Sequence, residues 1–187
     1  MENAQEILEK SGVVLKGHFL LTSGLHSPVY WEKFKVLQFP HYTEQLCHMI
    51  ANHFRKQEIQ VVAGPTTGGI ILSFEVARQL GVRSIFAEKE GNKGRAFGRG
   101  FSINPGERVL VVDDILTTGG SIREVLEAVK NQDGIVVGVG VLIDRSEQKV
   151  DFGVPLFSCH QAETITYPPE NCPQCAAQIP LIKPGGS

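Results

Sequence analysis

The acidic pair Asp113-Asp114 is the part of this sequence with the clearest capacity for chemistry. It follows the apolar run 109–112 and precedes a turn rich in hydroxyl groups and glycine, Thr117-Thr118-Gly119-Gly120-Ser121. The backbone N–H groups of such a turn, together with the start of a following helix, can bind a phosphate dianion. Two adjacent carboxylates would repel that phosphate unless they also accept hydrogen bonds from sugar hydroxyls or help to hold a hydrated Mg²⁺. The segment therefore predicts a cradle for a ribose 5-phosphate.

The same residues have a plainer interpretation, in which Asp114 and Ser121 merely cap a helix in an ordinary strand–turn–helix. Capping does not require two acids at the carboxyl end of a strand, which is where open α/β sheets bind ligands, so we favour the cradle. The turn contains no lysine, and the GxxxxGK[ST] spacing of a nucleoside-triphosphate P-loop does not occur in the sequence.

The elements that must position this turn alternate between strand and helix, which favours an α/β fold with a mainly parallel sheet. A second turn, Gly64-Pro65-Thr66-Thr67-Gly68-Gly69, also lies between an apolar run and a predicted helix, and it can form a second anion-binding site. The predicted strands are 19–24, 28–31, 61–64, 84–87, 108–112 and 135–143, and the predicted helices are 2–11, 40–54, 70–80 and 121–131. Residues 88–100 hold four glycines and four cations beside only two acids, and they predict a mobile basic loop.

Composition limits the class of protein. The chain has 187 residues, a formal net charge of -2, 42% hydrophobic residues and 20% charged residues. One globular domain fits this length, and the charge excludes nucleic-acid binding through bulk positive charge. The longest strongly apolar stretch, 135–143, is far shorter than the ~20 residues that a membrane span needs. The first six residues lack the basic and apolar regions of a secretory signal, so we expect a cytoplasmic protein with reduced thiols.

The chain resembles the type I phosphoribosyltransferases. Residues 109–121 resemble their phosphoribosyl-pyrophosphate (PRPP) motif, and residues 64–69 resemble their pyrophosphate loop. Within this family the orotate enzymes are the most similar. Residues 19–30 resemble their N-terminal hood, and Leu142-Ile143-Asp144-Arg145 resembles the segment whose arginine binds the orotate carboxylate. The resemblance implies a single domain, 1–187, with a five-stranded, mainly parallel sheet, helices on both sides, a hood at about 1–38 and an irregular tail at about 167–187.

The reaction implied by the resemblance transfers ribose 5-phosphate from PRPP to orotate in pyrimidine (UMP) biosynthesis, giving orotidine 5′-phosphate and pyrophosphate. Mg²⁺ would be held mainly through the substrate, near Asp113 and Asp114 and without a direct protein ligand. Catalytic roles would fall to Asp113, Asp114 and Lys89. PRPP would be bound by Asp113, Asp114, Ile115, Leu116, Thr117, Thr118, Gly119, Gly120, Ser121, Thr66, Thr67, Gly68, Lys89 and Lys93. Orotate would be bound by Thr117, Arg145, Tyr30 and Trp31.

Three positions depart from the family pattern, which often has lysine at positions 22 and 68 and arginine at position 88. This chain has Thr22, Gly68 and Glu88 there. The departures concern the usual pyrophosphate contacts and not the fold. The family also often has a cis peptide in the pyrophosphate loop, which we expect at Thr66–Thr67. It further implies a homodimer in which the loop 88–100 reaches the neighbouring active site, whereas a plain solvated hairpin is the alternative.

Other interpretations of these residues stay open. Arg145 could pair with Asp144 or Glu147, Tyr30 and Trp31 could form the hood core, and Lys33 and Lys35 could lie on a solvated face. A phosphoribosyltransferase for a purine or for uracil would keep the cradle but would not need Arg145. A ligand-sensing regulator on this fold would need a DNA-binding segment, for which the chain has no spare domain.

The tail contains Cys172-Pro173-Gln174-Cys175, which has the spacing of a zinc knuckle. Cys159-His160 could complete such a site. A lone CxxC is a weak signal, and the surrounding spacing fits no standard zinc module. We therefore expect two ordinary thiols and no metal in the tail.

Overall fold

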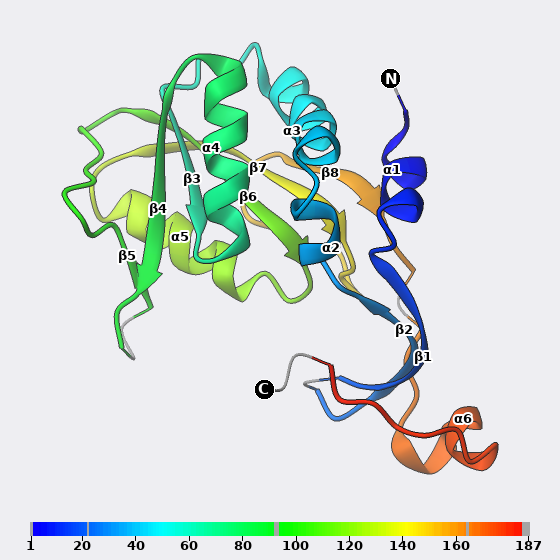
Figure 1. The fold of residues 1–187 in the computed structure, drawn as a ribbon. Coiled ribbons are helices and arrows are strands. Elements are labelled where there is room, and N and C mark those ends of the chain that lie inside the picture. Colours follow the sequence, from blue (N-terminus) through cyan, green and yellow to red (C-terminus); the bar gives the residue numbers. More distant parts are fainter. Residues whose placement is uncertain (1, 22, 92–93, 164, 185–187) are drawn as a thin grey trace.

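A six-stranded sheet forms the centre of the computed structural model, which describes residues 2–21, 23–91, 94–163 and 165–184 (Figure 1). The strand order is β5-β4-β3-β6-β7-β8. Five of these strands run parallel, as expected: β3 (Val61–Pro65), β4 (Arg83–Lys89), β6 (Arg108–Leu116), β7 (Ile135–Asp144) and β8 (Leu156–Gln161). The predicted strands missed two members of this sheet. One is β8, and the other is β5 (Arg95–Ala96), which pairs antiparallel with β4.

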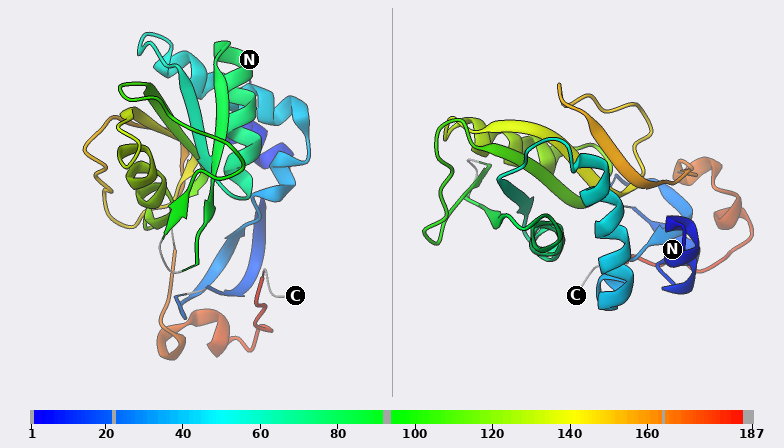
Figure 2. Two further views of the ribbon diagram at one scale, coloured as in Figure 1. Left: turned by 90° about the vertical axis from the view of Figure 1, so that its left-hand side faces the viewer. Right: turned by 90° about the horizontal axis from the view of Figure 1, so that it is seen from above.

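Helices cover both faces of the sheet (Figure 2). One core lies beneath α1 (Ala4–Lys10), α2 (Phe34–Leu37), α3 (Pro40–Phe54) and α4 (Gly68–Leu80), and the other lies beneath α5 (Gly120–Lys130). Side chains of β6 alternate between the two cores, as the pleat of a strand requires: Leu110 and Val112 face the first core, and Val109 and Val111 face the second. Among the residues described, no helix is long and apolar enough to cross a lipid bilayer.

The hood is a separate antiparallel ribbon of β1 (Val14–Leu20) and β2 (His26–Trp31), which lies beyond the carboxyl ends of the sheet strands (Figure 1). Strand β1 begins earlier than the predicted residue 19. A shift of register between Lys16 and Phe19 interrupts the alternation of its side chains, which hid its first half from sequence analysis.

The end of the chain returns to this ribbon. Leu20 N donates to Ile182 O, and Ile182 N donates to His18 O, both at 2.8 Å. His26 and Tyr167 also exchange backbone hydrogen bonds, at 2.9 and 2.8 Å. The tail is less irregular than expected, because it contains the 3-10 helix η1 (Pro169–Asn171) and the short helix α6 (Pro173–Ala176). The hood is therefore built from both ends of the chain.

Candidate active site

The acidic pair lies inside β6, because this strand continues past the acids to Leu116 in register with β7. Both side chains are buried. Asp113 Oδ1 accepts a hydrogen bond from Asp114 N at 2.8 Å, and Asp114 Oδ1 accepts one from Ile115 N at 2.7 Å. Neither Asp114 nor Ser121 caps α5, since that helix starts from Gly119 without a side-chain cap. The capping interpretation is therefore wrong, and the acids are oriented by their own strand.

Lys33 supplies the positive charge beside this pair. Its Nζ lies 3.0 Å from both carboxylate oxygens of Asp114, although the two residues are 81 positions apart. Burial, followed by the charge of Asp114, raises the pKa of Asp113 to about 7. From the sequence alone, Lys33 could equally have lain on a solvated face. Its place two residues after β2 in the predicted hood was the signal that could have assigned it to the site.

The turn after β6 forms the predicted anion site. Gly119 has φ 79°, and a Cβ on it would lie 2.9 Å from the Phe152 ring, so both backbone and space require glycine there. Thr117, Thr118 and Ser121 are exposed beside the buried acids. The N-terminus of α5, with its unpaired N–H groups, faces the same region. Polar donors therefore lie directly next to two carboxylates.

The second turn joins β3 to α4, and β3 is the neighbour of β6, so the two turns share one edge of the sheet. The Thr66–Thr67 peptide is cis, which confirms the expectation for this loop. A Cβ on Gly68 would overlap the carboxylate of Asp114 and lie 2.8 Å from its Cγ. In this arrangement the backbone at Gly68 lies against the carboxylate of Asp114, and a side chain at position 68 would displace that carboxylate.

The basic segment is partly ordered within its own chain. Arg95 Nη1 donates to Thr66 Oγ1 at 2.9 Å, and Arg95 Nε lies 3.1 Å from Glu124. Arg99 grips Glu88 through two hydrogen bonds of 2.8 and 2.9 Å, and this contact lowers the pKa of Glu88. Both arginines of the basic segment are therefore paired with residues of their own chain. Arg95 also places a guanidinium on the pyrophosphate loop, a role that its sequence position did not reveal.

The two lysines of the basic segment, Lys89 and Lys93, are predicted to bind PRPP. Lys89 is exposed at the end of β4, next to the pairing of Glu88 with Ala96. Lys93, which the resemblance assigns to PRPP binding, lies outside the described residues, as does Thr22 in the hood. The roles of Lys89 and Lys93 stay predictions.

Arg145 directly follows β7, and its backbone N donates to Leu116 O at 2.8 Å, next to the phosphate turn. Burial lowers the pKa of this guanidinium, and nearby Tyr30 opposes that shift. Asp144 is engaged with Ser146, whose N and Oγ donate to its carboxylate at 2.9 and 2.7 Å. Arg145 thus lies beside the turn that follows β6, and Tyr30 lies near Arg145.

Tyr30 and Trp31 point to opposite faces of the hood ribbon, as successive strand residues do. Trp31 packs against the first core, with its ring centroid 5.7 Å from that of His160. Tyr30 contacts Phe19 at 5.7 Å on the other side. The packing favours the hood-core interpretation for Trp31, whereas Tyr30 lies on the side of Arg145.

Comparison with known proteins extends these observations. Residues 36–154 match the family described as phosphoribosyl transferase domain. The chain is 52% identical over 184 residues to orotate phosphoribosyltransferase of Caldanaerobacter subterraneus, which covers 98% of this chain and 96% of that protein. It is 55% identical over 179 residues to the protein of that name from Pelotomaculum thermopropionicum, with 96% and 94% covered.

Solved structures show the same fold. The crystal structure of orotate phosphoribosyltransferase from Aeropyrum pernix matches with a TM-score of 0.69 and 28% identity, covering 83% of this chain and 92% of that one. The orotate phosphoribosyltransferase of Mycobacterium tuberculosis matches with a TM-score of 0.72 and 23% identity, covering 86% and 97%. An adenine phosphoribosyltransferase matches at 0.65 and 19%, covering 83% and 98%. The last two similarities concern the fold alone.

Proposed function

From the premise that this chain belongs to the orotate phosphoribosyltransferase family, we propose that it transfers the ribose 5-phosphate of PRPP to orotate. The products are orotidine 5′-phosphate and pyrophosphate, in pyrimidine biosynthesis. The observation that carries this proposal is the identity of more than half of the residues with orotate enzymes over nearly the whole chain. Arg145, with a planar fork that suits a carboxylate, supports orotate over bases that carry none.

The chain's own groups supply binding and electrostatic stabilisation in this reaction. Asp113 and Asp114 accept hydrogen bonds from the ribose hydroxyls, and their charge favours the positive charge that develops on the ribosyl carbon. The turn Thr117–Ser121 holds the 5-phosphate at the start of α5, and the turn at Thr66–Gly68 binds the pyrophosphate. Arg95 donates to Thr66 and so places a positive charge beside the turn that binds the pyrophosphate leaving group.

Mg²⁺ is the proposed cofactor, held mainly through PRPP. The buried carboxylates of Asp113 and Asp114 fit it, because Mg²⁺ prefers hard oxygen ligands and retains water molecules that these oxygens can bind. When bound, the ion neutralises charge on the leaving pyrophosphate. We expect activity to be lost after treatment with a chelator and restored by added Mg²⁺. Full activity in the chelated enzyme would contradict the assignment.

The specificity test offers the purified protein orotate, uracil, hypoxanthine and adenine in turn, with PRPP and Mg²⁺, and measures pyrophosphate release. We expect turnover with orotate alone. The Asp114→Asn variant is the matched control, because it removes one charge while keeping a carbonyl oxygen for the bond from Ile115 N. It should lose turnover and stay folded. Turnover with another base equal to that with orotate would contradict the proposal.

A homodimer is proposed as the active form, with Lys89 of each chain reaching the neighbouring site. Arg95 and Arg99 are bound to Glu124 and Glu88, whereas Lys89 projects from the end of β4. Mixing a Lys89→Ala chain with an Asp114→Asn chain would leave one complete site in each mixed dimer. We expect activity to return to about one quarter of the wild-type value at equal mixing. If mixed dimers form and stay inactive, Lys89 does not act across the interface.

The cytoplasm is the proposed location. The four cysteines are free thiols in this structure, as is usual for proteins of a reducing compartment. Fractionation of cells that produce the protein at native level tests this point. Recovery in a membrane or secreted fraction would contradict it.

A further inference from the structure

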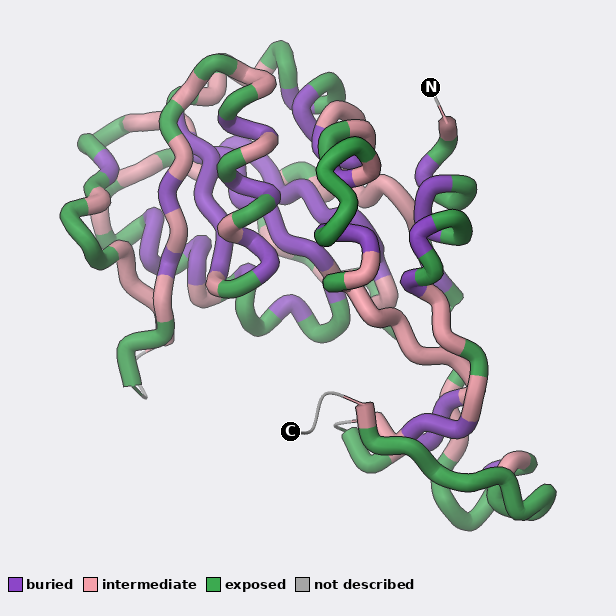
Figure 3. Tube along the Cα trace, in the orientation of Figure 1, coloured by how far each residue is buried: buried purple, intermediate pink, exposed green. Residues whose placement is uncertain are grey.

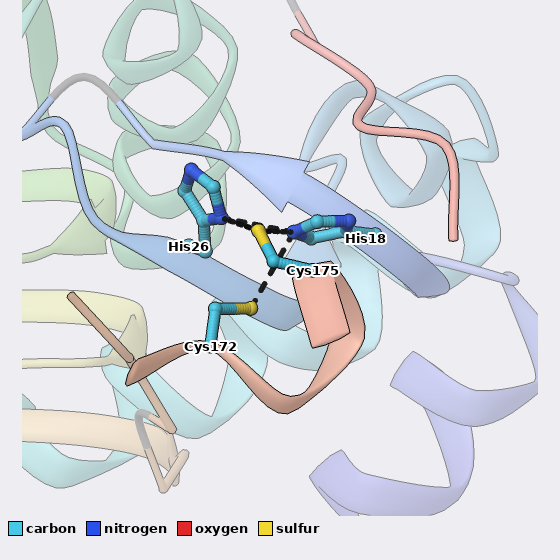
Figure 4. A group of neighbouring side chains, drawn as sticks. All are labelled: His18, His26, Cys172 and Cys175. Carbon is cyan, nitrogen blue, oxygen red and sulfur yellow. Dashed lines mark hydrogen bonds between the residues drawn. The ribbon is translucent and has the colours of Figure 1, made fainter. Parts of the chain in front are cut away.

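Four potential metal ligands meet where the tail crosses the hood ribbon (Figure 4). His18 comes from β1, His26 from β2, Cys172 precedes α6, and Cys175 lies in α6. One ligand atom of each residue lies within 4.8 Å of the ligand atoms of the other three. These are two imidazoles and two thiols, a set typical of structural zinc sites.

The residues that lie next to Cys172 and Cys175 differ from those that the sequence suggested. Cys159 donates from its thiol to Leu46 O at 3.4 Å, and His160 lies beside Trp31, so neither joins Cys172 and Cys175. His18 and His26 stand there instead. They are 154 and 149 positions away from the cysteines that they contact, and no local spacing could have linked them.

The distances fit a tetrahedral centre. Zinc–sulfur bonds of about 2.3 Å and zinc–nitrogen bonds of about 2.0–2.1 Å place S and N ligand atoms about 3.5 Å apart around such a centre. Here His18 Nε2 lies 3.5 Å from Cys172 Sγ and 3.7 Å from Cys175 Sγ, and His26 Nδ1 lies 3.3 Å from Cys175 Sγ. The two imidazole nitrogens are closer, at 2.9 Å. All four ligand atoms lie within 4.8 Å of one another, so small movements of these side chains would bring them to tetrahedral distances around one ion.

The other nitrogen of His18 fixes the orientation of its ring. His18 Nδ1 lies 2.8 Å from Ile179 O, and because a carbonyl can only accept, Nδ1 carries the hydrogen. In the neutral ring, Nε2 then presents its lone pair to the cluster. Histidines that bind metals commonly donate their second N–H to a carbonyl in this way, which holds the tautomer and the ring orientation.

The tail has little apolar packing to hold it in place. Ile165, Ile179, Leu181 and Ile182 are between 43% and 51% exposed, and the exposed trace of this segment is visible in Figure 3. His18, His26 and Cys172 are instead among the buried residues, at 2%, 5% and 4% exposed. A small unit that buries polar ligands in place of an apolar core is the kind that a structural metal stabilises.

We propose that His18, His26, Cys172 and Cys175 bind one Zn²⁺ that fixes the C-terminal tail to the hood ribbon. The site is independent of the transfer reaction and reverses the expectation of two ordinary thiols. Its closed set of four protein ligands indicates a structural and not a catalytic ion, since a catalytic zinc keeps a position open. The ion would hold β2, the strand that leads to Tyr30 and Lys33.

The first experiment measures zinc in protein purified without chelators, by elemental analysis. We expect about one Zn²⁺ per chain in the wild type, and a loss of at least about tenfold in Cys175→Ser, because a hydroxyl is a poor replacement for a thiolate ligand. Cys159→Ser is the matched control and should retain the zinc. Cys175 is exposed, so its replacement leaves the buried packing unchanged. Absence of zinc from the wild type, or equal zinc in both variants, would overturn the proposal.

A second measurement is independent of the variants. Wild-type protein stripped with a chelator and reloaded with Co²⁺ should show the visible absorption of a tetrahedral cobalt–thiolate centre, and Cys175→Ser should not. Stripping should also make Cys172 and Cys175 reactive toward a thiol reagent, while added Zn²⁺ should protect both. A Cys172–Cys175 disulfide in freshly purified protein, detected as a mass lower by two hydrogens, would refute the metal site. Thiols that react equally with and without Zn²⁺ would refute it as well.

Discussion

Replacing Asp113 by asparagine should stabilise the protein against unfolding while abolishing its proposed chemistry. The carboxyl group has an ordinary pKa of 3.8 and a pKa of about 7 in the fold, where burial and the charge of Asp114 oppose its ionisation. The native state therefore binds this proton more tightly than the unfolded chain does. Raising the pH from 4 to 7 removes stability, and above pH 7 the loss is complete.

The size of the effect follows from the two pKa values. A difference of about 3 units corresponds to roughly 4 kcal/mol at pH 8, of which about 2–3 kcal/mol develops between pH 5 and pH 8. Asparagine is neutral throughout this range, and its carbonyl oxygen can still accept the hydrogen bond from Asp114 N. The free energy of unfolding of the variant should therefore not fall with rising pH as that of the wild type does.

Urea unfolding of the two proteins from pH 5 to pH 9, without substrates, tests this reasoning. The free energy of unfolding of Asp113→Asn minus that of the wild type should rise between pH 5 and pH 7 and then level off. A difference that stays constant with pH, or a wild type that gains stability relative to the variant as the pH rises, would refute the argument. Turnover of the variant should be lost at every pH, because the carboxylate that is costly to bury is the one proposed to bind the ribose.

Three further substitutions probe the site. Gly68→Ala should lower kcat by about tenfold or more, because its Cβ would displace the Asp114 carboxylate at an overpacking cost on the order of 1–3 kcal/mol; unchanged steady-state kinetics would contradict this contact. Lys33→Met should reduce kcat and should raise the pKa of Asp113 further, because the Lys33 charge lowers that pKa. A pKa of Asp113 that is unchanged in the variant, measured by NMR titration, would contradict this reasoning. Arg145→Ala should raise KM for orotate far more than KM for PRPP, and equal increases would make Arg145 a scaffold residue.

Local patterns were sufficient for the parts of the site that are continuous in sequence. The acids of β6 and the turn before α5 stand next to one another along the chain, and the turn before α4 follows the same strand–turn–helix pattern. Parallel strands bring such turns to one edge of a sheet, so their meeting could also be expected. The strand β5 was missed because two residues carry no periodicity, and its pairing with β4 depends on contacts that form only in the fold.

Contacts between distant segments were beyond sequence reasoning. Lys33 reaches Asp114, and Arg95 reaches Thr66 and Glu124, across spans that no local spacing encodes. The sequence gives the number of charges in the basic segment, but it does not say which acidic residue, if any, pairs with Arg95 or Arg99. The same limit hid the histidines that join the CxxC pair.

The meeting of the two chain ends has a consequence for the order of events during protein synthesis. Strands β1 and β2 pair with each other early, but their contacts with residues 165–182 form only after that segment is made, and His18 and Ile179 are 161 positions apart. A lone two-stranded hairpin is at best marginally stable in water. The growing chain can form the central sheet first, because β3 to β8 and their helices are complete before the tail exists. The hood therefore assembles after the sheet, and a chain truncated before residue 165 should fold its central sheet but leave the β1–β2 ribbon without the segment that packs against it.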